Sequence, residues 1–347
     1  MIGVAALVLS LGFGPAHALE PVSLPLPPLA TFPDQEPPDL DSLAWALYSI
    51  DEGAMLWTGN PDQARAPASI TKVMTALVVI DRALPDEVVV VSQTAADAPI
   101  GFPGQPELEV GEEWTIEELL AFLLVKSGND SAVALAEAAA GSEEAFAELM
   151  NERAAELGMS ASHFVNPNGL DDTGHLSTAR DLIRLGVAAL REPRLVALTR
   201  VQATTFRPGT RVVPVNNTNK LLGTFPGILG LKTGDTSAAG LVLLSYVHTA
   251  HEEFVGVVMG ADDHLGATAD LMAYAARTLG LKDHFYSVLA DHEAAAAFPE
   301  WLRNRFAAAG PLADPSAAPS SPYTTPGEAT VLQMLRVVLP RVLGGDG

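Results

Sequence analysis

The chain has 347 residues, of which 48% are hydrophobic, so it is long enough to bury a substantial core in one large domain or two smaller ones. Its net charge of −22 repels phosphates and anionic lipid headgroups over most of the surface, which argues against a nucleic-acid partner. The complete absence of cysteine excludes a disulfide framework, a thiolate zinc site, a cysteine nucleophile and a lipid-modified N-terminal cysteine.

The first forty residues have the composition of a leader followed by a linker. An apolar run over residues 2–13 precedes the triplet Ala16-His17-Ala18, and this pattern predicts a secretory signal peptide over residues 1–18. The Lys or Arg that usually precedes such a run is missing, so a truncated start or a retained anchor is the alternative. Seven prolines in residues 19–40 predict a linker. We therefore expect an exported protein, located in the periplasm or cell envelope.

Strand patterns occupy both ends of the next 240 residues, and helical patterns lie between them. Two short strands, 45–50 and 54–58, flank a turn, and a helix is predicted from Ser69 because apolar residues recur there at three- and four-residue steps. Thr115 and Glu118 form a capping box before an apolar helix over 119–125. The remaining predicted elements are helices at 130–140, 142–157, 177–190 and 264–280, a turn at 166–169, and strands at 204–207, 211–215, 241–248 and 254–259.

This order predicts one α/β domain over residues 41–282, with a mainly antiparallel sheet shared by the early and late strands. A helical extension is expected at 283–308 and a second linker, with five prolines, at 309–327. The tail, residues 328–347, contains a short apolar segment that is a candidate for weak membrane association, as is the N-terminal segment. A docked or unstructured tail is the alternative.

The chain has only five lysines, and one of them, Lys72, ends the motif Ser69-Ile70-Thr71-Lys72. Residues three apart share a helix face, so the hydroxyl of Ser69 and the amine of Lys72 can meet, and a helix start offers free backbone N–H groups beside the serine. Lys72 can act as a base only if burial and a second cation lower its pKa. Taken alone, the motif is weak, because about one Ser-x-x-Lys is expected by chance in a chain of this length. An N-capped helix with an exposed lysine is then the simpler interpretation.

Two further motifs follow it in the chain. Ser127-Gly128-Asn129 comes after an apolar helix, and Lys232-Thr233-Gly234 comes after a Gly-rich apolar stretch. Separately they indicate a plain turn and the entry to a strand. Each of the three patterns occurs once, in this order, which is the triple signature of penicillin-recognising serine enzymes in its Ser-Gly-Asn form.

On these motifs the chain resembles the low-molecular-mass D-alanyl-D-alanine carboxypeptidases, over about residues 41–282. Further segments carry the resemblance: Ala66–Thr75, Val125–Asp130, Asn166–Leu170, Ser177–Leu182, Gly230–Gly234 and Ala238–Gly240. The resemblance implies a β-lactamase/DD-peptidase-like fold, an antiparallel sheet flanked by helices with a helical subdomain. It also implies peptidoglycan stem peptides as substrates, covalent binding of β-lactam antibiotics, and no cofactor or metal.

The same resemblance assigns roles to the motif residues. Ser69 attacks the carbonyl of the penultimate D-alanine and Lys72 takes its proton. Ser127 relays a proton to the leaving D-alanine, and Asn129 holds Lys72 and the substrate backbone. Lys232 and Thr233 receive the terminal carboxylate, and Gly234 leaves room for the substrate backbone beside the strand. The backbone N–H groups of Ser69 and Asp235 form the oxyanion hole. Two positions depart from the family pattern: Asp235, where many relatives have an aromatic residue or histidine, and Thr218, where some have arginine.

Other functions compete with this one. A β-lactamase on the same fold needs an added base for deacylation, and no Glu-x-x-x-Asn occurs between Ser127 and Lys232. A catalytically silent cell-wall-binding protein would not need its motif residues intact, whereas a peptidoglycan endopeptidase would use the same ones. His248 and His251 straddle a predicted turn and have no supporting ligands, so a metal site is not expected there.

Overall fold

The structure, a computed structural model, describes residues 37–99, 101, 107–225, 227–249 and 252–279. Its centre is a five-stranded antiparallel sheet in the order β2-β1-β9-β8-β7. The strands are β1 (Ala44–Ser49), β2 (Ala54–Gly59), β7 (Ile228–Thr236), β8 (Gly240–His248) and β9 (Glu253–Ala261). β1 pairs with β2 on one side and with β9 on the other, so the first and last strands are joined. The prediction of a mainly antiparallel sheet shared by early and late strands is confirmed.

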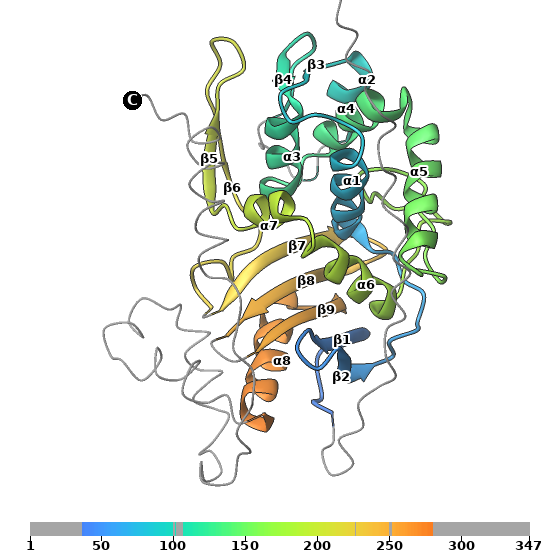
Figure 1. Ribbon diagram of the computed structural model, residues 1–347, viewed down its shortest axis with the longest axis vertical. Coiled ribbons are helices and arrows are strands. Elements are labelled where there is room, and N and C mark those ends of the chain that lie inside the picture. The colour runs from blue at the N-terminus through green and yellow to red at the C-terminus, as the bar shows by residue number, and fades with distance from the viewer. Residues whose placement is uncertain (1–36, 100, 102–106, 226, 250–251, 280–347) are drawn as a thin grey trace, which may run out of the picture.

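Helices cover both faces of this sheet (Figure 1). Because neighbouring residues of a strand point to opposite faces, Leu244 and Val255 pack with α6 (Ala179–Ala189), whereas Leu243 and Phe254 pack with α8 (His264–Thr278). α6 lies close to the sheet because it presents Gly186, at which a Cβ atom would come within 2.6 Å of Val255. The sheet is therefore a buried layer between two helical layers.

A helical subdomain stands above the β7 edge of the sheet in Figure 1. Its central helices α1 and α3 are almost entirely buried, and α3 is apolar at every position from Leu119 to Val125. The elements of the subdomain are η1 (Ala68–Ile70), α1 (Thr71–Ile80), α2 (Gln93–Ala96), α3 (Ile116–Val125), α4 (Asn129–Ala140) and α5 (Glu143–Glu156), with the short strands β3 (Val88–Val90) and β4 (Glu113–Thr115). α7 (Pro193–Thr199) and the hairpin of β5 (Ala203–Phe206) and β6 (Val213–Asn216) then lead back to β7.

Local sequence signals account for several helix ends. The Thr115 side chain accepts a hydrogen bond from the backbone N–H of Glu118, whose carboxylate accepts one from the backbone N–H of Thr115, so the predicted capping box is confirmed. Gly158, with φ +71°, follows the end of α5 as predicted. α2, α7, β3 and β4 were not predicted, because each is too short to show a periodic pattern.

The terminal predictions fall on residues that the structure does not describe. The signal peptide, all but the last four residues of the first linker, the helical extension, the second linker and the tail lie outside the described residues. Among the helices that are described, none combines the length and the hydrophobicity required to cross a bilayer.

Candidate active site

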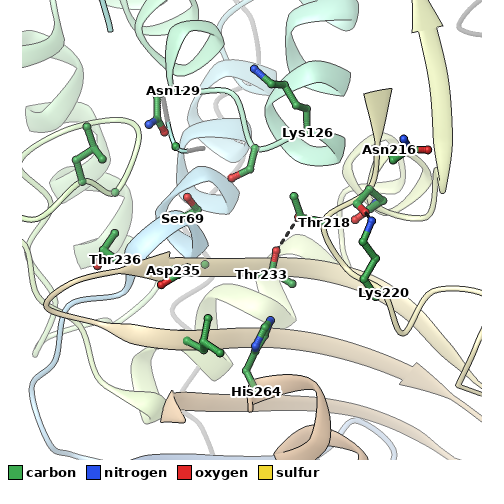
Figure 2. Close-up of a pocket in the computed structure, with 17 residues that line it drawn as sticks. Ser69, Lys126, Asn129, Asn216, Thr218, Lys220, Thr233, Asp235, Thr236 and His264 are labelled. Carbon is green, nitrogen blue, oxygen red and sulfur yellow. Dashed lines mark hydrogen bonds between the residues drawn. The ribbon is translucent and has the colours of Figure 1, made fainter. Parts of the chain in front are cut away.

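A cavity of about 360 Å³ opens between the β7 edge of the sheet and the helical subdomain (Figure 2). The structure brings six of the predicted site residues to its wall: Ser69, Ser127, Asn129, Thr233, Gly234 and Asp235. The other two, Lys72 and Lys232, are buried, with 0% and 1% of their surface exposed. Three segments that are far apart in the chain therefore meet at one place, as the three motifs require.

Ser69 lies in the 3-10 turn η1, immediately before α1. The regular helix begins at Thr71, two residues later than predicted, because the chain makes a tighter turn over Ala68–Ile70. Ala68 has φ +47°, a conformation that L-residues seldom adopt. Its carbonyl oxygen would lie 2.0 Å from a Cβ atom on Gly169, whose own φ is +82°, so only glycine fits at that position.

The Lys72 amine has three polar partners. Its Nζ lies 2.9 Å from Ser69 Oγ, 2.7 Å from Asn129 Oδ1 and 2.5 Å from the backbone oxygen of Asn168. The Asn129 amide is oriented by its Nδ2, which donates to the Pro99 carbonyl at 2.7 Å, so its oxygen faces Lys72. Two of the three partners can only accept a hydrogen bond, and only the Ser69 hydroxyl can also donate one.

Both protonation states of the amine satisfy these partners, because an ammonium group can donate to all three. A neutral amine has two N–H donors, for Asn129 and Asn168, and one lone pair that can accept the Ser69 O–H. Burial, reinforced by the positive charges of Lys232 and Lys126, holds the pKa of Lys72 well below its usual range, although the Asp130 carboxylate opposes the shift. The arrangement can therefore remove a proton from Ser69.

Ser127 lies at the junction of α3 and α4 and faces the cavity. Its φ of +71° is in the left-handed region. The next residue, Gly128, is enclosed by the Asp130, Phe122 and Ser131 side chains, each within 2.7 Å of where a Cβ atom would be. This tight packing fixes the chain reversal that brings the Ser127 hydroxyl and the first residue of α4, Asn129, to the same pocket.

Lys232 and Thr233 lie on β7 and are both tied to Thr218, which belongs to the loop between β6 and β7. Thr233 Oγ1 donates to Thr218 Oγ1 at 2.6 Å (Figure 2). Lys232 Nζ lies 3.4 Å from the same Thr218 oxygen and 2.9 Å from the Thr233 carbonyl. Burial lowers the pKa of Lys232 to about 7. The hydroxyl of Thr218 thus contacts both residues that are predicted to bind the substrate carboxylate, Lys232 and Thr233.

Gly234 faces η1, and a Cβ atom there would come 2.8 Å from the Ser69 backbone nitrogen. Any larger residue would therefore push β7 away from the serine. Asp235 follows it as an exposed residue at the mouth of the cavity. Within the described residues β7 is an edge strand, and Thr233, Gly234 and Asp235 on it line the cavity.

The loop Asn166–Leu170 has a structural role that sequence reasoning missed. It was predicted as a turn and as a segment that carries the family resemblance, with no contact assigned to it, yet its Asn168 carbonyl contacts the Lys72 amine and its Pro167 carbonyl accepts from Thr75 Oγ1 at 2.6 Å. The Asn166 side chain accepts from the Gly169 backbone N–H at 2.7 Å, which closes the loop on itself. The Asn-Pro-Asn-Gly sequence signals this closed loop, but no local signal shows what the loop contacts.

His175 is a second residue that was not predicted. Its Nδ1 accepts the Val165 backbone N–H at 3.1 Å, so the proton of the neutral ring lies on Nε2, 2.8 Å from the Thr71 hydroxyl. Burial lowers the pKa of His175 to about 4. The neutral ring therefore connects Val165, which directly precedes the Asn166–Leu170 loop, to Thr71, which directly precedes Lys72.

Metal ligands were not expected. In the described ranges no group of three or more acidic, histidine or cysteine side chains could hold a metal ion. His248 Nδ1 lies 2.7 Å from Glu253, and His251 lies outside the described residues.

A depressed histidine pKa predicts how stability depends on pH. The folded state favours neutral His175, so its contribution is complete above pH 6.5 and is lost as the pH falls through about 4. The shift corresponds to about 3 kcal/mol. His175→Gln should therefore be less stable than the parent at pH 7, and this difference should shrink towards pH 4 in urea unfolding. A difference that stays constant between pH 7 and pH 4 would contradict the assignment.

Comparisons with known proteins identify the family of the chain. A family model described as D-alanyl-D-alanine carboxypeptidase, peptidase S11, matches residues 31–263. The D-alanyl-D-alanine carboxypeptidase DacF of Bacillus subtilis is 36% identical, over 62% of this chain and 56% of the relative. A D-alanyl-D-alanine endopeptidase of Pseudomonas aeruginosa is 34% identical, over 70% of this chain and 77% of the relative.

A solved structure of a carboxypeptidase has a similar fold. The D-alanyl-D-alanine carboxypeptidase DacD from Francisella tularensis has a TM-score of 0.65 and 27% identity, over 69% of this chain and 71% of that one. The chain spans between 56% and 67% of the length of four curated carboxypeptidases that it matches. Because the family model covers most of the sequence, from before β1 to the start of α8, the chain belongs to the peptidase S11 family of D-alanyl-D-alanine carboxypeptidases.

Proposed function

We propose that the protein is an exported serine-type carboxypeptidase that removes the terminal D-alanine of peptidoglycan stem peptides through an acyl-enzyme at Ser69. The observation that carries this proposal is the contact of the Ser69 hydroxyl with the Lys72 amine, whose complete burial lowers its pKa and favours the neutral form. A hydroxyl paired with a neutral base at a cavity wall is the arrangement that nucleophilic catalysis needs. Peptidoglycan is reached from outside the cytoplasmic membrane, so export to the periplasm or cell envelope is part of the proposal.

The first step is acylation. Ser69 Oγ attacks the carbonyl carbon of the penultimate D-alanine while its proton passes to Lys72, and a C–O bond forms. The carbonyl oxygen becomes negatively charged between the backbone N–H groups of Ser69 and Asp235, and each such donor typically contributes about 3 to 4 kcal/mol. The C–N bond then breaks, and Ser127 delivers its hydroxyl proton to the departing D-alanine nitrogen and takes back the proton held by Lys72, so Lys72 is neutral again.

The second step is deacylation. A water molecule attacks the ester at Ser69, its proton passes to Lys72, and the shortened peptide leaves as the serine regains its proton. During acylation Lys232 and Thr233 bind the carboxylate of the leaving D-alanine, and in both steps Asn129 binds the peptide backbone. Gly234 allows the substrate to lie against the free edge of β7, as an added strand does.

A peptidoglycan endopeptidase is the second candidate, because the Pseudomonas relative carries that name. The same residues would then cleave a peptide cross-link. Turnover of a pentapeptide ending in D-Ala-D-Ala against turnover of a cross-linked dimer separates the two activities. A β-lactamase is less well supported, because no Glu-x-x-x-Asn lies between Ser127 and Lys232 to activate the deacylating water. A silent binding protein would be identified by the absence of any turnover.

The first prediction concerns β-lactams. Since no added deacylating base is present in the expected sequence pattern, penicillin should form a long-lived adduct on Ser69, visible by intact-mass spectrometry after minutes. Ser69→Ala should show no mass increase. Rapid return to the free mass, with hydrolysed drug in solution, would instead favour the β-lactamase.

The second prediction separates the two buried lysines. Lys72→Arg should lower the acylation rate about 1,000-fold or more, because a guanidinium stays protonated at working pH. Lys232→Arg keeps a positive charge and should mainly raise KM. Acylation rates with penicillin and with a D-Ala-D-Ala peptide test both. Normal acylation by Lys72→Arg together with an inactive Lys232→Arg would show that the base and the anchor are exchanged.

The third prediction uses the left-handed conformation of Ser127. Ser127→Gly and Ser127→Ala both remove the proton relay, so both should lose about 100-fold in turnover. Glycine tolerates positive φ, so Ser127→Gly should be more stable than Ser127→Ala by about 1 kcal/mol. Chemical denaturation and turnover on the same samples measure the two effects. Full activity in either variant would remove Ser127 from the mechanism.

A further inference from the structure

An exposed cation lies beside the pocket and has no role in the steps above. Lys220 follows the Asn217-Thr218-Asn219 loop and lines the cavity. Its Nζ donates to the Asn217 carbonyl at 2.9 Å, which holds the side chain against the loop. None of the ion pairs formed among the described residues includes Lys220. Its positive charge is therefore available to a ligand.

The position of Lys220 matches one end of the proposed substrate. Figure 2 shows Lys220 and Thr218 beyond Thr233, on the side of the pocket opposite Ser69. The Thr218 hydroxyl contacts both Thr233 and Lys232, so the loop that carries Lys220 is bonded directly to the proposed carboxylate ligands. A peptide whose reacting carbonyl is at Ser69 and whose terminal carboxylate is at Thr233 ends next to this loop.

The electrostatics of the pocket favour such a cation. The chain carries a net charge of −22, so its overall field repels an anionic peptide. Lys232 is 1% exposed, and burial lowers its pKa to about 7, so at neutral pH it is charged only part of the time before a carboxylate arrives. Lys126 also lines the cavity, but it is 5% exposed and lies over the Phe122 ring. Lys220 is the exposed lysine of the three.

We propose that Lys220 is a substrate-binding residue whose ammonium group receives the terminal carboxylate of the substrate from solvent, beside Thr233. The inference rests on the proposed carboxypeptidase function and adds a residue to its carboxylate site. Some relatives have arginine at the position of Thr218, and in this chain Lys220 would supply a positive charge two residues further along. The charge acts at the solvent-facing edge of the pocket, so the contribution of Lys220 belongs to binding and not to the chemical step.

The test uses two substrates that differ by one charge. One is an N-acyl-D-alanyl thioester whose thiol leaving group carries a carboxylate, and the other is its methyl ester. Lys220→Met should raise KM for the carboxylate substrate about 5-fold at low salt, with kcat unchanged, because an exposed charge pair has modest strength. It should leave the methyl ester unaffected, and Lys220→Arg should restore KM. The 5-fold effect should shrink in high salt.

Arg82→Met is the matched control. Arg82 is an exposed cation just beyond the opposite end of α1 from Ser69, and its removal changes the net charge equally. An equal effect of Lys220→Met on both substrates, no effect on either, or the same effect from Arg82→Met would overturn the inference while the parent remains active. A parent protein that hydrolyses neither thioester nor peptide would instead overturn the proposed function, and this inference with it.

Discussion

The burial of the Lys72 amine is the constraint on which the rest of the site depends. A charged ammonium at 0% exposure would lose its hydration, and the partners that surround it include no carboxylate in direct contact. The fold meets this cost by supplying two fixed acceptors, the Asn129 side chain and the Asn168 carbonyl, and one hydroxyl that can donate. Each acceptor comes from a different segment. The hydrogen bonds that Lys72 Nζ makes therefore help to fix the positions of α4 and of the Asn166–Leu170 loop.

The fold was largely predictable because its signals are local and repeated. Nearly continuous apolar runs mark β8 and β9, which are buried on both faces, and the capping box marks the start of α3. Short elements such as α7 gave no periodic signal. The motif residues were predictable as a set, but the turn around Ser69 was not, because the 3-10 geometry depends on the contact of Ala68 with Gly169. That contact joins residues a hundred positions apart.

The contacts that the sequence did not reveal are made by backbone atoms and by side chains outside the motifs. The Asn168 carbonyl is a ligand to Lys72 through its main chain, and any residue has a carbonyl. His175 works through a buried contact with Thr71, and Thr218 through hydroxyl contacts with β7. Such roles follow from where the chain places a group in space. The residue type alone does not disclose them, and only the assembled fold makes them visible.

The pairing of β1 with β9 has a consequence for how the molecule forms. These strands join residues 44–49 to residues 254–259, so the sheet cannot close until nearly all of the described chain has been synthesised. A shorter nascent chain contains Ser69 and Lys72 but lacks the strand that connects β1 to β8. Contacts between such distant residues also slow folding, because a long loop must close first. The nascent polypeptide therefore cannot complete the sheet, or the pocket beside it, until β7, β8 and β9 have been synthesised.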